Sequence, residues 1–485
     1  MTRRLVLLLT VALCSSCHPS GTATIADELA RVRANCLVIV LDATAAGHVG
    51  AYGYTRGTTP TVDAMARDGV LFTRAYSAGS STVVSVPTLV FGAYPQTIAH
   101  RAYRDHAGAP GSYRTHFGLA HAMLAWKNGE AEVPPHLVRT FRDSGFRTAG
   151  FTENPLASNS LVLGDGFEHF VENKEPPSDR TTEATVAAIV EWLGANRDAR
   201  FFAYLHVLRP HNPYLPPEDI AERFRPASYR GDLKPDTPTM RAIHRGRRRL
   251  RPGDLDFIVS QYDANLFYAD QLVARVLQRL ADLGIADRTL VVVTADHGEG
   301  FGQHGRFLHG SSLYEEMIRI PLVVRIPRGV AIQPARVDVP VSLVDLFPTF
   351  VELFGLTLAK PLEADGKSLV PLMMNPSAPW PRTTLFAQAD TSVAAIEREF
   401  KYLVRLDQHG REEQLFFLRG DAGERADLAA ISGPKVERMR NDVTAFLGGP
   451  VVDQSIGAAV GPLDEERRRQ LQALGYIDDA DDAER

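Results

Sequence analysis

Two apolar runs that each end in an aspartate constrain the fold of this chain more than any other feature. The first run is Asn35–Leu41 and stops at Asp42, and the second begins at Thr289 and stops at Asp296. Each run is long enough for a buried strand and too short for a helix. Strands that are apolar throughout belong to sheets covered on both faces. The two runs therefore predict an α/β protein in which both carboxylates reach the same edge of one sheet.

The order of the predicted elements indicates how this sheet is built. Strands such as Val70–Tyr76 and Phe201–Leu205 alternate with helices such as Thr181–Leu193 and Leu255–Leu283 up to about residue 380. This alternation is typical of a mostly parallel, doubly wound sheet. Short runs separated by polar turns then predict a small antiparallel subdomain at 383–450, after a main domain at 33–382. Residues 451–485 are predicted to be a tail, which is acidic after Ile477.

Composition narrows the class of protein. Apolar residues make up 45% and charged residues 23% of the 485 residues, which is usual for a soluble globular protein. The net charge of −5 gives no reason to expect binding to nucleic acid or to membrane surfaces in general. The three cysteines, Cys14, Cys17 and Cys36, all lie near the N-terminus, so a disulfide framework is not predicted.

The N-terminus has the pattern of a targeting segment. Arg3 and Arg4 precede the apolar run Leu5–Leu13, which is shorter than the ~20 residues that span a bilayer and matches a secretory signal. Small residues before Cys17 resemble a bacterial lipobox, although Cys14 stands where an aliphatic residue is usual. We therefore expect a lipoprotein-type signal peptide at 1–17, a tether at 18–32, and export to the periplasm or cell envelope with a lipid anchor on Cys17. The alternative is a plain signal peptide cut nearby.

The loop that follows the second run predicts a metal site. Asp296 and His297 stand side by side at the end of the strand, and His304 and His309 follow in a glycine-rich loop. Ligands of open α/β sheets bind beyond the carboxyl ends of the strands, and a carboxylate beside an imidazole suits a divalent metal. Taken alone, the Asp-His pair would be an ordinary strand exit with a turn residue. The hydroxyl-rich segment Ser77–Pro87 is a candidate to present an alcohol at the same edge.

Taken together, these stretches resemble the sulfatase family of the alkaline phosphatase superfamily. The similarity covers nearly all of the predicted mature chain. The similarity is found in three segments. They are the first run with its continuation, LVIVLDATAAGHVGAYGY, and the segments TLVVVTADHGEGFGQHG and LYEEMIRIPLVVRIP. Motifs of this number in the family's order do not arise by chance. The resemblance implies a three-layer α/β/α sandwich with a mostly parallel sheet, a small C-terminal α+β subdomain with four strands, and a metal at the strand ends.

The resemblance also implies roles for individual residues. The metal ligands would be Asp42, Asp296 and His297, joined by the oxygen of the nucleophile. The nucleophile position lies ten residues before the glycine of the family's Thr-Gly pair, and counting back from Gly92 gives Thr82. The substrate's anionic oxygens would be contacted, or its leaving group protonated, by His211 and His309, with His206 and His304 as further substrate-binding candidates.

The nucleophile motif departs from that of sulfatases that convert a Cys or Ser to formylglycine. Those enzymes carry C/S-x-P-S-R, whereas residues 82–86 read TVVSV. Threonine cannot give that aldehyde, so no formylglycine is expected. Ala43 stands where many sulfatases have a second Asp, and Arg209 where an acidic residue is common. Threonine is the direct nucleophile in some relatives, where a metal favours its alkoxide form.

These observations lead to one functional expectation and two alternatives. The expectation is an exported hydrolase that uses Thr82 on an anionic sulfate or phosphate ester and depends on a divalent ion, with Ca, Mg, Mn and Zn left open. The first alternative is a transferase of the phosphoethanolamine or phosphoglycerol type. The second is a catalytically inactive binding protein with the same fold. Ala43, Val84, Val86 and Arg209 favour it, because each removes a polar feature from the site.

Overall fold

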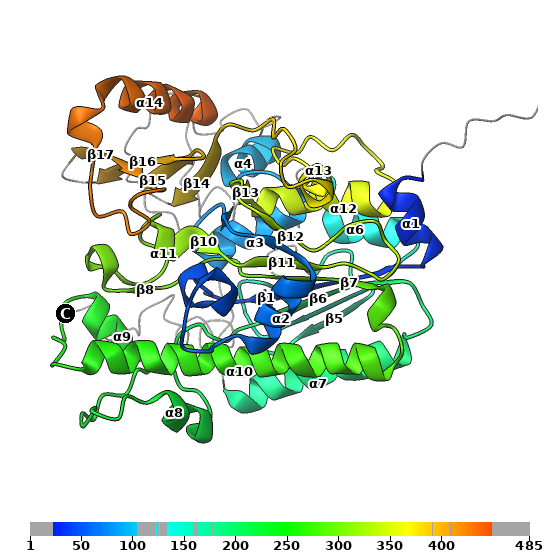
Figure 1. Ribbon diagram of the computed structural model, residues 1–485, viewed down its shortest axis with the longest axis horizontal. Coiled ribbons are helices and arrows are strands. Elements are labelled where there is room, and N and C mark those ends of the chain that lie inside the picture. The colour runs from blue at the N-terminus through cyan, green and yellow to red at the C-terminus, as the bar shows by residue number, and fades with distance from the viewer. Residues whose placement is uncertain are drawn as a thin grey trace, which may run out of the picture.

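The computed structural model describes residues 23–448 except 104–122, 124–125, 127–132, 159–162, 176–177, 390 and 408–409. Its centre is an eight-stranded sheet that crosses the middle of Figure 1. The pairings are parallel except for the two made by the antiparallel strand β11. In sheet order the strands are β12 (Ala335–Val337), β2 (Val70–Phe72), β11 (Leu322–Arg325), β7 (Thr289–Thr294), β1 (Asn35–Leu41), β6 (Phe201–Val207), β4 (Arg147–Thr152) and β5 (His169–Glu172).

The side chains of β1 divide between two hydrophobic cores, one on each face of the sheet. Cys36 and Val38 point into a core closed by α1 (Ile25–Arg31), α3 (Thr82–Phe91), α6 (Leu137–Asp143), α12 (Leu346–Phe354) and α13 (Val370–Met374). Leu37 and Ile39 point into a core closed by α2 (Pro60–Asp68), α7 (Asp179–Ala195) and α10 (Asp254–Asp282). Because successive strand residues face opposite sides, a strand apolar throughout serves both cores. The predicted three-layer α/β/α fold is confirmed.

A second sheet, antiparallel and four-stranded, forms the small C-terminal unit at the upper left of Figure 1. It consists of β14 (Leu385–Ala389), β15 (Ser392–Ile396), β16 (Phe400–Asp407) and β17 (Gly410–Phe417), in that order. Helix α14 (Gly433–Leu447) packs on one face of it through Val436, Met439 and Val443. The other face packs against Leu313, Met317 and Ile318 of the main domain. This unit is the predicted α+β subdomain.

Shorter elements connect these units. The main domain carries two small sheets, one of three strands and one of two. They are formed by β10 (Arg319–Ile320), β3 (Ala75–Tyr76) and β13 (Val341–Ser342), and by β8 (Gly300–Phe301) and β9 (Phe307–Leu308). Further α-helices of the described residues are α4 (Pro95–Tyr103), α8 (Glu218–Phe224), α9 (Thr237–His244) and α11 (Glu315–Ile318).

Two predicted elements differ from the observed ones. The predicted strand Val70–Tyr76 is two strands in different sheets, because β2 pairs with β11 and β12 whereas β3 pairs with β10 and β13. The predicted tether, residues 18–32, contains the capped helix α1, and Leu29 of this helix is fully buried in the core. The predicted signal peptide 1–17 with Cys17 and the predicted tail 451–485 lie outside the described residues. Within the described part, every helix is too short or too polar to cross a membrane.

Candidate active site

Four neighbouring strands bring polar side chains to one edge of the main sheet. In the order β7, β1, β6 and β4, these strands run parallel, so their carboxyl ends lie together. Asp42 directly follows β1, and Asp296 and His297 follow β7 by one residue. His206 lies on β6 opposite Val40 of β1, and Asn154 follows β4. This is the strand-end location at which open α/β sheets bind ligands.

The two aspartates converge on two imidazoles. His206 Nε2 lies 3.2 Å from Asp42 Oδ2 and 3.9 Å from Asp296 Oδ2. His297 Nε2 lies 3.5 Å from Asp42 Oδ1 and 3.6 Å from Asp296 Oδ2. The Nδ1 atom of His297 donates to the Gly298 carbonyl at 2.9 Å, which turns Nε2 toward the carboxylates. Asp42, His206 and Asp296 form a possible metal-binding triad, with His297 beside it.

Thr82 places its hydroxyl in this cluster. It is the first residue of α3 and is fully buried. Its Oγ1 donates to Asp296 Oδ2 at 2.7 Å and lies 3.4 Å from His297 Nε2. Asn154 Nδ2 donates to Thr82 Oγ1 at 3.2 Å and also to Asp42 Oδ2. The structure therefore brings together the four residues that the sequence predicted as metal ligands, namely Asp42, Thr82, Asp296 and His297.

The backbone around Asp296 fixes the orientation of its carboxylate. Asp296 Oδ1 accepts hydrogen bonds from the backbone N–H of His297 at 3.0 Å and of Ala43 at 3.2 Å. Ala43 adopts a left-handed conformation with φ of 55°, and its carbonyl accepts from the Tyr262 hydroxyl at 2.8 Å. Such a conformation is uncommon for a residue other than glycine. With Oδ1 held by these two N–H groups, the other carboxylate oxygen, Oδ2, faces Thr82.

The donor set fits a divalent cation. Asp42 Oδ1 is buried and has no hydrogen-bond partner among the described residues. A buried carboxylate is stable only when it is paired or coordinates a metal. The donor atoms of the cluster are 3.2 to 3.9 Å apart, which is close to the spacing of ligands around one ion with bonds of ~2.0–2.2 Å. Oxygen and imidazole donors together suit Ca, Mg, Mn or Zn better than a soft metal.

The titration of the cluster reflects an excess of negative charge. Burial by itself lowers the pKa of His206 and of His297, yet the nearby Asp42 and Asp296 carboxylates raise both above the ordinary value. Burial raises the pKa of Asp42, but the surrounding imidazoles outweigh this effect and hold it well below its usual range. Asp42 is therefore an anion near neutral pH. The cluster attracts positive charge, whether a proton or a metal ion.

Two further histidines lie beside this cluster. The ring of His309 is centred 4.3 Å from that of His297 and 4.7 Å from that of His211. His309 Nδ1 lies 3.0 Å from Glu299 Oε1, and His211 Nδ1 donates to the Asn212 carbonyl at 2.5 Å. Burial lowers the pKa of His211, and it lowers that of His309 to about 3. In this structure both rings are therefore neutral near pH 7.

His304 makes its contacts elsewhere. Its Nδ1 lies 2.9 Å from Glu316 Oε1, its Nε2 lies 3.1 Å from the Glu424 carbonyl, and its ring stacks on Tyr314 at 3.7 Å. None of these partners belongs to the cluster around Thr82. The prediction that His304 binds substrate therefore gains no support from its contacts, which join the main domain to the C-terminal subdomain.

Sequence reasoning missed two members of the cluster. Asn154 was not predicted at all, and His206 was assigned to the substrate although it belongs to the possible metal triad. Both were marked by the signal that identified Asp42, since each is a polar residue at the end of a buried strand. Glu299 was missed as well. It is fully buried, and burial raises its pKa to about 7.

The chain is similar in sequence to known sulfatases. Arylsulfatase K of Xenopus laevis is 28% identical over 308 residues, which cover 56% of each chain, so this chain matches just over half of that relative. The delta 4,5-hexuronate-2-O-sulfatase of Bacteroides thetaiotaomicron is 24% identical over 88% of this chain and 90% of its own.

A solved structure shows the same fold over nearly the whole length. The phosphonate monoester hydrolase of Agrobacterium radiobacter has a TM-score of 0.63 at 20% identity, covering 85% of this chain and 95% of its own. The sulfatase family model matches residues 34–356, a range that contains each of the predicted catalytic and metal-binding residues. By this match the chain belongs to the sulfatase family.

Proposed function

We propose that this chain is an exported, metal-dependent hydrolase of sulfate or phosphate esters that uses Thr82 as its nucleophile. The observation that carries the proposal is the 2.7 Å hydrogen bond from Thr82 Oγ1 to Asp296 Oδ2, inside the cluster that also holds Asp42, His206 and His297. The buried hydroxyl of Thr82 donates to Asp296 Oδ2 and accepts a hydrogen bond from Asn154 Nδ2. That arrangement is expected of a nucleophile whose proton must leave.

Asp42, Asp296, His206 and His297 would hold the divalent ion, and Thr82 stands next to them. When bound, the ion would lower the pKa of the threonine hydroxyl and withdraw charge from the oxygens of the ester. The sulfatase family is metal-dependent, which agrees with the lack of a hydrogen-bond partner for Asp42 Oδ1 among the described residues. The choice among Ca, Mg, Mn and Zn is left to the assay described below.

The chain's own residues account for the movement of protons and of the transferred group. Thr82 Oγ1 forms a bond to the phosphorus or sulfur of the ester, and its proton passes to Asp296 Oδ2, the oxygen to which it already donates. The bond to the ester oxygen breaks, and the electron pair stays on that oxygen, which takes a proton from His211 or His309. Water then forms a bond to the phosphorus or sulfur and gives a proton back to the same histidine. The bond to Thr82 Oγ1 breaks, Oγ1 takes its proton back from Asp296, and the sulfate or phosphate is released. Asn154 keeps the threonine oxygen oriented throughout.

Both histidines need a proton before they act as acids. They are neutral in this structure because they are buried beside one another and beside His297. An anionic ester placed against them would favour the protonated form, because an opposite charge within a few ångströms raises the pKa of an imidazole. Binding of the substrate would thus supply the general acid. This order of events favours dianionic or monoanionic esters over neutral ones.

The substrate class follows from the site and from the relatives. The names of the relatives include a sulfatase for a hexuronate 2-O-sulfate and a hydrolase for phosphonate monoesters. In both reactions the transferred group is tetrahedral and carries anionic oxygens, and the cluster described here suits either. Residues 82–86 read TVVSV, so we propose that catalysis proceeds without formylglycine.

One observation favours the alternative of a binding protein without turnover. Asp42, Thr82 and His297 have no exposed surface, so an ester reaches Thr82 only if neighbouring side chains move. His309 and His211 are the adjacent groups that would have to give way. Measured turnover would exclude this alternative.

The deciding experiment is a substrate screen with matched variants. Nitrophenyl sulfate, a nitrophenyl phosphate monoester and a nitrophenyl phosphodiester are tested with Ca, Mg, Mn and Zn in turn. We expect turnover of at least one ester, a loss of about a thousandfold or more in Thr82→Ala, and retained activity in Thr82→Ser. Melting curves check that both variants are folded. Undiminished turnover in Thr82→Ala contradicts the assignment, and product analysis with an alcohol present separates a hydrolase from a transferase.

Export and lipidation are a separate part of the proposal. Their support is the sequence of residues 1–17, in which Arg3 and Arg4 precede an apolar run that ends near Cys17. In a bacterial host, the wild-type chain should partition with membranes and Cys17→Ser should be soluble in the periplasm. Equal partitioning of the two proteins would contradict the lipid anchor and leave the catalytic assignment unchanged.

A further inference from the structure

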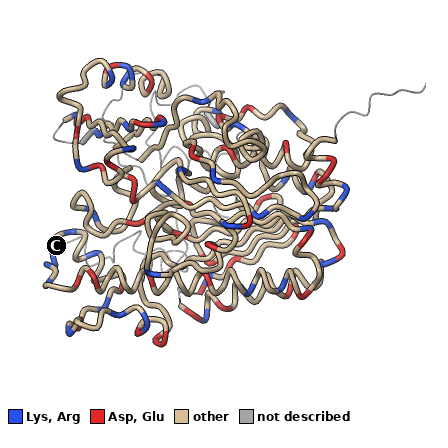
Figure 2. The backbone as a smooth tube through the Cα atoms, in the orientation of Figure 1, with Lys and Arg blue, Asp and Glu red and all other residues tan. Residues whose placement is uncertain are grey.

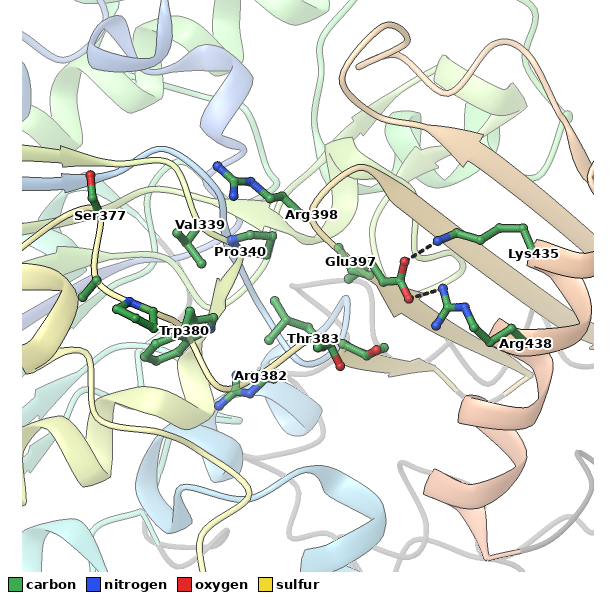
Figure 3. Close-up of a pocket in the computed structure, with 15 residues that line it drawn as sticks. Val339, Pro340, Ser377, Trp380, Arg382, Thr383, Glu397, Arg398, Lys435 and Arg438 are labelled. Carbon is green, nitrogen blue, oxygen red and sulfur yellow. Dashed lines mark hydrogen bonds and ion pairs between the residues drawn. The ribbon is translucent and has the colours of Figure 1, made fainter.

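Charged side chains around the cavity between the two domains are balanced by one another. Basic and acidic residues are interspersed along α14 (Figure 2), and Figure 3 shows Lys435 and Arg438 reaching from this helix toward Glu397. Arg438 also pairs with Asp442. Arg398 is directed away from these pairs in Figure 3. Within the described residues, this cavity therefore has no converging set of unpaired cations. Hydrogen bonds that converge on the chemistry are found instead at the loop after β1.

The loop that follows β1 is held by two consecutive residues of α10. The Tyr262 hydroxyl donates to the Ala43 carbonyl at 2.8 Å and accepts from the Ala45 N–H at 3.1 Å. The next residue, Asp263, binds three side chains farther along the same segment, those of His48, Tyr54 and Arg56. The helix thus holds the backbone at the start of this segment and the side chains that follow.

The ring of Tyr262 has a fixed position. It is fully buried, and three rings lie around it with centroids 4.7 to 5.7 Å away, those of His48, Tyr214 and Phe301. Rotation of the tyrosine would displace these rings, because protein interiors are closely packed. The hydroxyl is therefore presented to the loop in one direction.

Ala43 needs such a partner because of its conformation. Its φ of 55° lies in the left-handed region, which residues other than glycine keep only where the surrounding structure holds them. The two peptide groups that flank Ala43 are each held by a different side chain. The Ala43 N–H donates to Asp296 Oδ1 at 3.2 Å, and the Ala43 carbonyl accepts from Tyr262. A buried carbonyl without a donor is costly, so loss of the tyrosine hydroxyl would favour a different turn.

We propose that Tyr262 is a positioning residue for the active site. Its hydroxyl holds the left-handed turn at Ala43, and the turn fixes the carboxylate of Asp296 through the Ala43 N–H. Asp296 Oδ2 then stays directed at Thr82 and within the possible metal triad. Tyr262 acts through Ala43 and Asp296 and not on the ester itself. The inference rests on the metal binding proposed above, because groups that orient a ligating carboxylate set the affinity for the ion.

The test measures metal binding to the full chain by titration calorimetry without substrate, with Ca, Mg, Mn and Zn in turn. Tyr262→Phe removes only the hydroxyl, and we expect the affinity for the tightest ion to fall by about tenfold or more. The matched control is Tyr268→Phe, which removes from the same helix a hydroxyl that donates to Glu183 at 2.9 Å, outside the cluster. It should leave the affinity unchanged. Melting curves without the ion check that each variant is folded.

A double variant separates positioning from a general loss of structure. Glycine adopts a positive φ without strain, so Ala43→Gly in the Tyr262→Phe background should form the same turn without the hydroxyl and recover most of the affinity. This recovery is measured against the wild type, so the double variant also serves if Tyr262→Phe alone is too unstable to titrate. Unchanged affinity in Tyr262→Phe, an equal loss in Tyr268→Phe, or no recovery in the double variant overturns the inference.

The result is distinguishable from failure of the proposed function. Binding is read without turnover, so it is independent of whether Thr82 is a nucleophile. If the wild-type chain binds none of the four ions, the proposed metal site fails and the role of Tyr262 fails with it. If the wild type binds an ion and Tyr262→Phe binds it equally well, only the role of Tyr262 is overturned.

Discussion

Two pairs of buried carboxylates in this protein are balanced in different ways. Glu315 and Glu424, at the junction of the two domains, share the fully buried Lys401, whose Nζ lies 3.3 Å from Glu315 Oε1 and 2.9 Å from Glu424 Oε1. Asp42 and Asp296, at the edge of the main sheet, have only imidazoles and polar hydrogens around them. The first pair carries its own permanent cation and the second does not.

The difference separates a structural site from the candidate active site. Burial alone would lower the pKa of Lys401, but Glu424 and Glu315 raise it, so the ammonium stays charged and joins β16 to α11. Around Asp42, the raised pKa values of His206 and His297 show that the protein supplies positive charge only in titratable form. A metal ion could therefore bind between Asp42 and Asp296, whereas Lys401 already occupies the position between Glu315 and Glu424.

The largest expected effect on stability is at Lys401. Lys401→Met leaves Glu315 and Glu424 buried without a counter-charge, which should reduce the free energy of unfolding by ~3–5 kcal/mol. Urea unfolding of the wild type and the variant measures the difference. As a control, Arg419→Ala breaks an exposed ion pair with Glu399 and should cost no more than ~1 kcal/mol. Equal losses in the two variants would mean that Lys401 is not the structural cation.

A smaller effect is expected from metal binding. A divalent ion at a hundredfold excess over its Kd should raise the free energy of unfolding by about 2.7 kcal/mol, and EDTA should reverse the gain. Asp42→Asn should lose this gain because it removes a carboxylate of the possible triad. Lys401→Met should keep it, despite being less stable. Melting curves with and without the ion give the result, and an equal gain in Asp42→Asn would place the ion elsewhere.

The smallest effect is a pH dependence at the junction. Burial, with a further contribution from Glu315, raises the pKa of Glu424 from 4.5 to about 7 in spite of Lys401. Between these two values the folded chain holds a proton that the unfolded chain releases, so the free energy of unfolding falls as pH rises. Glu424→Gln should flatten this fall by on the order of 1 kcal/mol in urea unfolding.

Glu413→Gln provides the control for that measurement. Hydrogen bonds from Arg440 hold the pKa of Glu413 at about 2, so it titrates below this window and the slope should be unchanged. If the free energy of unfolding of Glu424→Gln changes with pH as steeply as that of the wild type, then Glu424 does not bind the proton between pH 4.5 and about 7.

Elements of the main domain differ in how far the sequence predicted them. Helix α10 agrees with the predicted Leu255–Leu283 to within one residue at each end, because a long apolar stripe at helical spacing depends on local sequence alone. The predicted Val70–Tyr76 failed as one strand because the change of partner at Thr73 depends on sheets formed by distant segments. The same limit applied to Asn154, which only the order of the strands places against Thr82.

By itself the sequence determined the strand ends, the aspartates on them and the threonine at the expected distance from Gly92. Only the tertiary structure decided that Thr82 and Asp296, 214 residues apart, share a hydrogen bond and that His206 faces both aspartates. The physical reason is that side-chain chemistry and strand propensity are local. The point in space where several oxygens meet is instead set by the order β7, β1, β6, β4 and by the packing of α3 on that sheet.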